Sequence, residues 1–185
     1  MPFDATRQGR ASKRRAVLPR GMPSVERAIV ALGSNLGPRA HNLSFALREL
    51  APLVAVSQVF ETDPVGGPAQ QGAFFNLVAS LDTALDPHAF LRRCQAIEAA
   101  AGRTRDVHWG PRTLDIDVLF FGDRCLCSPD LVLPHPRFAE RRFVLAPLHE
   151  VAPERCPTGW RERLPALGVH PRGPLSVLIE SLRNR

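Results

Sequence analysis

The stretch RTRDVHWGPRTLDIDVLFF, residues 103–121, places two carboxylates at the start of an apolar run. Side chains alternate between the two faces of a strand, so Asp115 and Asp117 are expected to point from the same face. Two hard oxygen ligands on one rigid edge suit Mg²⁺, which usually takes one or two carboxylates together with substrate phosphates. A solvated turn or a helix cap is the plainer interpretation of this spacing. The stretch predicts a strand over 114–121 and a candidate metal site at its start.

A loop rich in cations comes directly before the two carboxylates. It contains Arg103, Arg105, His108 and Arg112, and glycine and proline mark its course. Guanidinium groups match phosphate oxygens in pairs and keep their charge at all ordinary pH values. An ordinary solvated loop would also carry arginines, so the conjunction with the carboxylates is what favours metal–polyphosphate chemistry.

The hydrophobic pattern outward from this strand predicts the fold class. Short apolar runs at 27–32, 53–60 and 74–81 are expected to form strands beside 114–121. Helical spacing of apolar residues follows Pro38 and Asp86 in two segments between them. With the middle strands joined directly, the order β-α-β-β-α-β predicts an α+β fold, a ferredoxin-like antiparallel sheet with helices packed on it. C-terminal additions follow, with a short strand over 143–146 and an amphipathic helix over 175–182.

One polar residue stands in the middle of the expected strand 74–81. Asparagine is disfavoured in strands, and a buried Asn76 would need partners for both its donor and its acceptor. Beside Phe74 it would supply an amide next to a flat apolar wall. A solvent-exposed asparagine on a half-exposed strand is the equal alternative.

The charge distribution separates a basic tail from a nearly neutral body. The net charge is +6, and residues 1–21 hold six basic residues against one acidic residue. We expect residues 1–25 to be a disordered basic extension and residues 26–185 to be a single domain. A faint transit-peptide character of the tail, or a natural start at Met22, are alternatives. The neutral body argues against a specific nucleic-acid module, which would need a basic surface.

The composition is that of an ordinary soluble chain. No apolar run reaches transmembrane length, and the four cysteines contain neither a C-x-x-C pair nor zinc-finger spacing. We therefore expect a reduced, cytoplasmic protein. Monomeric action on small molecules, without a membrane or a specific nucleic-acid partner, is the simplest expectation.

Four sequence blocks in one order resemble a known family. They are ALGSNLG at 31–37, ETDPVGGPAQQGAFFN at 61–76, WGPRTLDIDVLFFG at 109–122 and LPHPRFAERRFVLAPL at 133–148. Together they resemble the 6-hydroxymethyl-7,8-dihydropterin pyrophosphokinases of the folate pathway, over roughly residues 27–153. The resemblance implies Mg²⁺-dependent transfer of an intact pyrophosphoryl group from ATP to the hydroxymethyl oxygen of the pterin, with release of AMP. It implies two Mg²⁺ ions and ATP as co-substrate.

The resemblance also implies roles for individual residues. The catalytic positions are Arg103, Arg112, Asp115 and Asp117, of which Asp115 and Asp117 hold the metal ions. The pterin-binding positions are Thr62, Val65, Phe74, Asn76, Trp109 and Phe143. The ATP-binding positions are Glu98, Arg105, His108, Trp109, Arg112, Val118, His135 and Arg141. The loops at 61–72 and 102–112 flank this site and are expected to close over it when both substrates are bound.

Three positions depart from the pattern of the family. His108 stands where arginine is common, Phe74 replaces a frequent tyrosine, and Asp63 takes a place often held by proline. None of the departures removes a metal ligand, so an active enzyme is expected. A non-catalytic relative that binds pterin or nucleotide, and a kinase that transfers a single phosphoryl group, remain alternatives.

Overall fold

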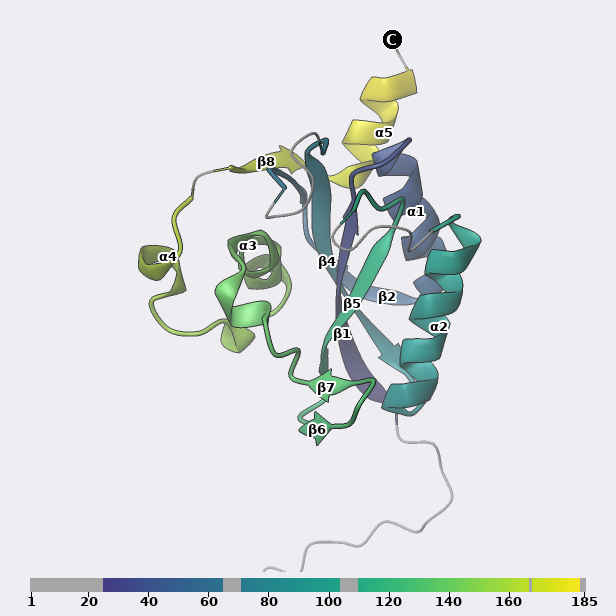
Figure 1. Ribbon diagram of the computed structural model, residues 1–185, viewed down its shortest axis with the longest axis vertical. Coiled ribbons are helices and arrows are strands. Elements are labelled where there is room, and N and C mark those ends of the chain that lie inside the picture. Colours follow the sequence, from purple (N-terminus) through teal and green to yellow (C-terminus); the bar gives the residue numbers. More distant parts are fainter. Residues whose placement is uncertain (1–24, 65–70, 104–109, 167, 184–185) are drawn as a thin grey trace, which may run out of the picture.

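The structure is a computed structural model that describes residues 25–64, 71–103, 110–166 and 168–183. The extension expected over residues 1–25 lies outside the described residues, except for Val25. Figure 1 shows a central sheet with helices α1 and α2 on one face and helix α3 on the other. Across the described residues, no helix combines the length and the apolar character that crossing a bilayer requires.

The main sheet confirms the predicted ferredoxin-like arrangement. Its order is β5-β1-β4-β3-β8, with β2 pairing β4 beside β3. Strand β1 is antiparallel to both of its neighbours, β4 and β5, so two split β-α-β units interlock. The strands are β1 Glu26–Ser34, β2 Leu53–Val56, β3 Val59–Thr62, β4 Phe74–Thr83, β5 Asp115–Phe121 and β8 Val169–Gly173. A small separate ribbon pairs β6 Leu126–Cys127 with β7 Val132–Leu133.

Helices α1 and α2 form as the sequence predicts. Helix α1, Arg39–Leu50, and helix α2, Pro87–Ala100, bury their apolar stripes against the sheet. The Asp86 carboxylate caps α2 by accepting a hydrogen bond from the amide of Ala89 at 2.9 Å. The helix ends before Gly102, whose φ of 76° is the left-handed conformation that glycine adopts readily.

The alternation along β4 divides the core into two layers. Phe75, Leu77, Ala79 and Leu81 join the core under α1 and α2. The neighbouring positions face α3, and Val78 packs there with residues of β1, β5 and α3. Asn76 points to the same side and is buried, so the alternative of a solvent-exposed asparagine is wrong.

The single strand predicted over 53–60 is wrong, because the chain breaks into β2 and β3 at Ser57. The amide of Ser57 donates to the carbonyl of Val78 at 2.9 Å, and its hydroxyl accepts from the amide of Val78 at 3.0 Å. A side chain therefore replaces a backbone carbonyl in the ladder. The interruption offsets β3 from β2 along β4 and brings Thr62 opposite Phe74.

The strand predicted over 143–146 is also wrong. These residues lie in helix α3, Arg142–Val151, where Val144, Leu145 and Leu148 are buried against the sheet. A short apolar run with β-branched residues reads equally as a strand or as a buried helix segment, and the internal Pro147 made the helix harder to see. The strand predicted over 27–32 is longer than expected, since β1 continues through Gly33 and Ser34.

The remaining elements lie toward the C-terminus. They are the short 3-10 turns Phe138–Glu140 and Pro153–Arg155, helix α4 Trp160–Arg163, and helix α5 Leu175–Arg183. Helix α5 confirms the amphipathic helix predicted there, and Leu175, Leu178 and Ile179 pack against the core under α1.

Leu145 tests the packing of α3 on the sheet. Its side chain is fully buried, so Leu145→Ala should lower the free energy of unfolding by roughly 2–5 kcal/mol. Val177 is 54% exposed, and Val177→Ala should change it by less than about 0.5 kcal/mol. Chemical denaturation measures both. Equal effects of the two substitutions would contradict the placement of α3.

Candidate active site

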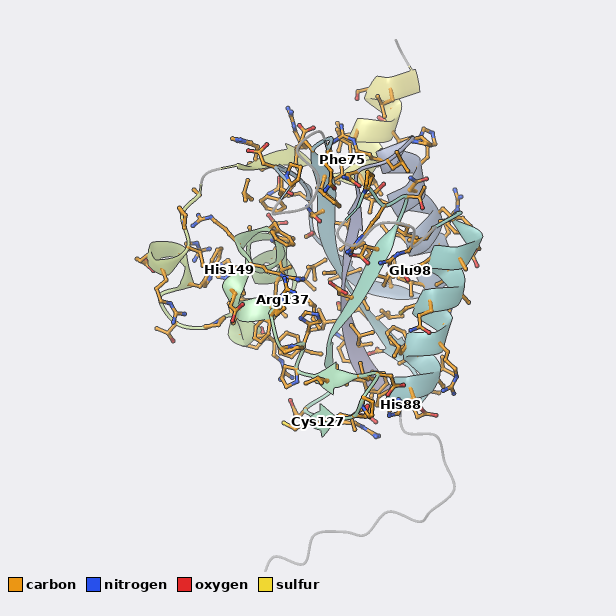
Figure 2. All side chains as sticks on the ribbon, viewed as in Figure 1. Phe75, His88, Glu98, Cys127, Arg137 and His149 are labelled. Carbon is orange, nitrogen blue, oxygen red and sulfur yellow. The ribbon has the colours of Figure 1, made fainter. Side chains whose placement is uncertain are left out.

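A pocket opens on the α3 face of the sheet. Its walls come from the ends of β1 and β3, the start of β4, the start of β5 and the start of α3. Eight of the residues predicted for the site line it, namely Thr62, Phe74, Asn76, Arg112, Asp115, Asp117, Arg141 and Phe143. Ala31, Gly33, Gln71 and Arg137 complete much of the lining, and Figure 2 shows Arg137 on the α3 side of the sheet.

The two carboxylates stand together on β5, as the strand periodicity predicts. Asp115 is paired with Gly33 and Asp117 with Ala31 across β1. Ile116, between them, points into the core on the opposite face. The pKa of Asp117 is raised, because its half-buried carboxyl in the pocket wall is partly removed from water and faces the charge of Asp115.

Three arginines balance this negative charge unequally. Arg103 Nη1 lies 2.6 Å from Asp115 Oδ1, and Arg112 forms an ion pair with the other oxygen of the same carboxylate. Among the described residues, the ion pair of Asp117 is a longer contact, 3.5 Å, between its Oδ2 and Arg141 Nη1. Asp115 is thus compensated on both oxygens, and Asp117 is the carboxylate that gains most from an added cation.

Glu98 acts on the pocket indirectly, through Arg103 and the start of β5. It is buried on α2, and Figure 2 shows it between α2 and β5. Its Oε1 accepts a hydrogen bond from the amide of Ile116 at 2.7 Å and forms an ion pair with Arg103. Glu98 therefore fixes the start of β5 and aims Arg103 at Asp115, but it does not line the pocket.

His135 lies beside the acidic end of the pocket. Its Nδ1 accepts a hydrogen bond from the amide of Arg137 at 3.2 Å, which leaves Nε2 to carry the proton of the neutral ring. Burial lowers the pKa of His135, Asp117 acts in the opposite direction, and Arg141 and Arg137 add to the lowering. The neutral imidazole is therefore a donor near Asp117 at neutral pH.

An amide and two aromatic rings form the other half of the pocket. Asn76 Nδ2 donates to Thr62 Oγ1 at 2.6 Å, so the amide is held in one orientation by the neighbouring strand. Phe74 and Phe143 line the same space from β4 and α3. This half offers a flat apolar wall with one oriented amide, as the sequence predicted for a buried Asn76.

Sequence reasoning missed the part that Gly33 plays, because the strand was predicted to end at residue 32. In the sheet, Gly33 is paired with Asn76 on one side and with Asp115 on the other. A Cβ at this position would lie 2.9 Å from Asn76 Oδ1, so only glycine leaves the amide where it is. A glycine inside a strand pattern often marks a close approach of this kind, and that was the available signal.

Asn35 was also missed, although it lies in the block ALGSNLG. Its Nδ2 donates to Gln71 Oε1 at 3.2 Å and to the carbonyl of Gly72 at 3.3 Å, while its Oδ1 accepts from the amide of Arg112 at 2.7 Å. One side chain thus joins the described end of the first predicted loop to the described end of the second.

The other predicted site residues are not all brought to the pocket. The side chain of Val118 is buried in the core on the opposite face of the sheet, so only its backbone could serve a ligand. Val65, Arg105, His108 and Trp109 lie outside the described residues.

The carboxylate pair fits a hard divalent cation. Oxygen ligands at the edge of a pocket, with unequal compensation by arginines, match the chemistry that Mg²⁺ prefers. Within the parts of the chain that the structure describes, no group of three or more His, Cys, Asp or Glu side chains could hold a metal ion. An ion on this pair would therefore take its remaining ligands from water or from a bound phosphate.

Comparisons with known proteins agree on one family. The sequence model described as 7,8-dihydro-6-hydroxymethylpterin-pyrophosphokinase (HPPK) matches residues 29–153. A protein of Pseudomonas aeruginosa named 2-amino-4-hydroxy-6-hydroxymethyldihydropteridine pyrophosphokinase is 48% identical over 141 residues, 73% of this chain and 86% of that protein. A protein of Bacillus subtilis with the same name is 44% identical over 129 residues, 67% of this chain and 77% of that protein.

Solved structures support the fold. Crystal structures of Plasmodium falciparum HPPK-DHPS superpose with TM-scores of 0.53 and 0.56, at 15% and 14% identity. These matches cover 69% and 88% of this chain. They span only 37% and 44% of the Plasmodium chains, which are considerably longer.

The charged carboxylate of Asp117 should destabilise the ligand-free protein. Because folding raises the pKa of Asp117, the contribution of this group to stability is fully present below the pKa of the unfolded state. That contribution is lost as the pH rises through the pKa of the folded state. Asp117→Asn removes the charge, so the melting temperature at neutral pH should rise, by about 2–4 °C for each 1 kcal/mol relieved. Thermal melting without ligand measures this.

The control for this prediction has the opposite sign. The pKa of Asp82 is lowered by its hydrogen bond from Arg27, so Asp82→Asn should leave the melting temperature unchanged or slightly lower. A lower melting temperature for Asp117→Asn than for the wild type would show that the carboxylate stabilises the fold.

Proposed function

The chain belongs to the 7,8-dihydro-6-hydroxymethylpterin-pyrophosphokinase family, and from this we propose that the pocket on the α3 face is its active site. The protein transfers pyrophosphate from ATP to the hydroxymethyl group of 6-hydroxymethyl-7,8-dihydropterin, which gives AMP and the pterin diphosphate in folate biosynthesis. One observation carries the placement of this reaction. Asn76 and Asp115 both face Gly33, so an amide reader and a carboxylate stand in one pocket at a fixed separation.

The pterin occupies the half of the pocket formed by the amide and the rings. A pterin is flat and carries donors and acceptors on one edge, so it stacks between Phe74 and Phe143 while Asn76 reads that edge. The hydrogen bond from Asn76 to Thr62 supports this assignment, because it fixes which end of the amide donates. Val65 and Trp109 complete the pterin positions by resemblance.

ATP and Mg²⁺ occupy the acidic half. Asp115 and Asp117 would hold two Mg²⁺ ions, which would supply charge neutralisation for the triphosphate and lower the pKa of the hydroxymethyl oxygen. The unequal compensation of the two carboxylates supports the assignment. Arg112 and Arg103 lie beside Asp115 and would donate to phosphate oxygens, which would stabilise charge on the transferred and leaving groups.

The remaining nucleotide positions surround this half. Arg141 and His135 lie next to Asp117 and can donate to phosphate or ribose oxygens. Glu98 contributes to ATP binding by holding Arg103 in place, and Val118 contributes to it through its backbone. Arg105 and His108 keep their proposed nucleotide contacts by resemblance.

We propose the following domain, compartment and oligomeric state for the reaction. Residues 26–185 act as one domain, in the cytoplasm and as a monomer, on small molecules only. No specific nucleic acid and no membrane takes part.

Product analysis tests the reaction. With Mg·ATP and 6-hydroxymethyl-7,8-dihydropterin, the protein should release AMP and pterin diphosphate in equal amounts. Chromatography that resolves AMP from ADP measures this. Release of ADP would mean transfer of a single phosphoryl group, and binding of both substrates without turnover would mean a non-catalytic relative.

The carboxylate pair tests the metal assignment. Asp115→Ala and Asp117→Ala should each lower kcat by about 10³-fold or more, because the triphosphate loses its metal template. In thermal melting with a non-hydrolysable ATP analogue, added Mg²⁺ should raise the midpoint of the wild type but not of either variant. Asp123→Asn is the control, since its side chain is 92% exposed and pairs with Arg155. Normal Mg²⁺-dependent turnover in either alanine variant would overturn the assignment.

Gly33 tests the pterin assignment. Gly33→Ala places a Cβ 2.9 Å from Asn76 Oδ1, so the amide must move, and the KM for the pterin should rise about tenfold or more with a smaller change for ATP. Gly72→Ala is the matched control, because its Cβ meets only an ordinary contact of 3.5 Å. Steady-state kinetics with each substrate varied in turn decides the point. An unchanged pterin KM in Gly33→Ala would place the pterin elsewhere.

A further inference from the structure

The chain forms a strand beyond the region that the family model matches. The family match ends at residue 153, and β8, Val169–Gly173, pairs with β3 from outside that region. Figure 1 shows β8 at the edge of the sheet, with α5 following it beside α1. Strand β3 ends at Thr62, a lining residue of the pocket, so β8 covers the strand that leads into the pterin half.

Two arginines form ion pairs with the two carboxylate oxygens of Glu61. Arg172 of β8 donates from Nε to Glu61 Oε2 at 2.7 Å, and Arg39 of α1 donates from Nη1 to Glu61 Oε1 at 3.1 Å. The side chain of Glu61 is only 18% exposed. Burial raises its pKa, but the hydrogen bonds from Arg172 and Arg39 outweigh this and the pKa is lowered. Glu61 is therefore a fixed, charged link between β8 and α1.

Arg39 extends the link to the other end of the first loop. Its Nη1 also donates to the carbonyl of Ala73 at 2.6 Å, and its guanidinium carbon lies 3.7 Å from the centre of the Phe75 ring. Figure 2 labels Phe75 at the same end of the sheet as β8. The series Arg172, Glu61, Arg39 and Ala73 thus joins the strand that enters the loop to the strand that leaves it.

A second contact holds the entry to the loop. The amide of Asp63 donates to the carbonyl of Gly168 at 3.0 Å. Gly168 has a φ of 70°, and a Cβ there would lie 2.6 Å from Asp63 Oδ2. The segment that leads into β8 therefore packs directly against the residue that follows Thr62.

These contacts end next to the residues that face the pterin. Thr62 follows Glu61 and orients the Asn76 amide, and Phe74 follows Ala73 and lines the pocket. Asn76 is itself paired with Phe60 of β3. A shift of β3 along β4 would move Thr62 away from Asn76, so whatever fixes β3 also fixes the amide.

We propose that β8 is a positioning element for the pterin half of the site, and that Arg172 acts on pterin binding through Glu61. The proposal rests on the assignment of the pterin to the pocket on the α3 face. Arg172 touches neither substrate, so it is a positioning residue and its removal should affect the pterin more than ATP.

The competing interpretation is an ordinary ion pair at the edge of a sheet, which contributes to stability alone. The chain supplies a matched control for it. Arg27 and Asp82 form a similar pair across β1 and β4, at 2.6 Å, and neither residue lines the pocket. Removal of Arg27 breaks an ion pair of the same kind, and neither partner of that pair lies on β3.

The experiment compares Arg172→Ala, Arg172→Lys and Arg27→Ala in the full-length protein. Arg172→Ala should raise the pterin KM about five- to twentyfold, with less than about a twofold change in the ATP KM and in kcat. Arg172→Lys keeps the charge near Glu61 and should recover most of the loss, and Arg27→Ala should behave as the wild type. Equal changes for both substrates, or no change for the pterin, would overturn the proposal.

Direct binding keeps this test separate from that of the reaction. The dissociation constant of the pterin, followed by its own fluorescence with an ATP analogue present, should rise in Arg172→Ala in parallel with KM. If the wild type binds pterin but forms no AMP, the proposed reaction fails while the binding comparison still decides the role of β8. If thermal melting shows that Arg172→Ala is partly unfolded, Glu61→Gln weakens the same link from the other side, and an unchanged pterin affinity there would overturn the proposal.

Discussion

The site depends on the pairing of one glycine with two neighbours. Gly33 on the central strand faces Asn76 on β4 and Asp115 on β5. Adjacent strands lie about 4.8 Å apart, so the backbones that carry the amide and the carboxylate are held roughly 10 Å apart. Because Gly33 has no side chain, the space between the Asn76 amide and the Asp115 carboxylate stays open. The separation between the proposed pterin reader and the proposed metal site is therefore set by the hydrogen-bonded ladder rather than by any loop.

The same geometry gives the acidic half its chemical character. Placing two carboxylates two residues apart on one face forces their charges together, and the pKa of Asp117 is raised first by burial and then by the charge of Asp115. Arg103 and Arg112 relieve Asp115, and Glu98 holds Arg103 in place from behind β5. The charges of the two carboxylates repel each other, and the same negative charge would attract a cation, so the destabilising effect of Asp117 and the proposed affinity for metal have one origin.

Sequence reasoning reached the sheet order and the carboxylate pair because both rest on period-two alternation and on caps that act locally, such as Asp86 on α2. It failed where local and tertiary signals compete. Residues 143–146 form a helix since the sheet offers an apolar face for Val144, Leu145 and Leu148, which a six-residue window cannot reveal. The roles of Gly33 and Asn35 depend on partners some 40 to 80 residues away in the chain, and no local pattern names such partners.

The C-terminal strand extends the same logic to the edge of the sheet. Without β8, β3 would be an edge strand whose position along β4 is secured by only three residue pairs. An edge strand of this length is weakly held, yet it carries Thr62, which orients the Asn76 amide. Pairing with β8 adds four residue pairs, and Glu61 joins that strand to α1 through two guanidinium groups. Strand β8 lies beyond the region that the family model matches, and it fixes a strand whose displacement would change the orientation of the Asn76 amide.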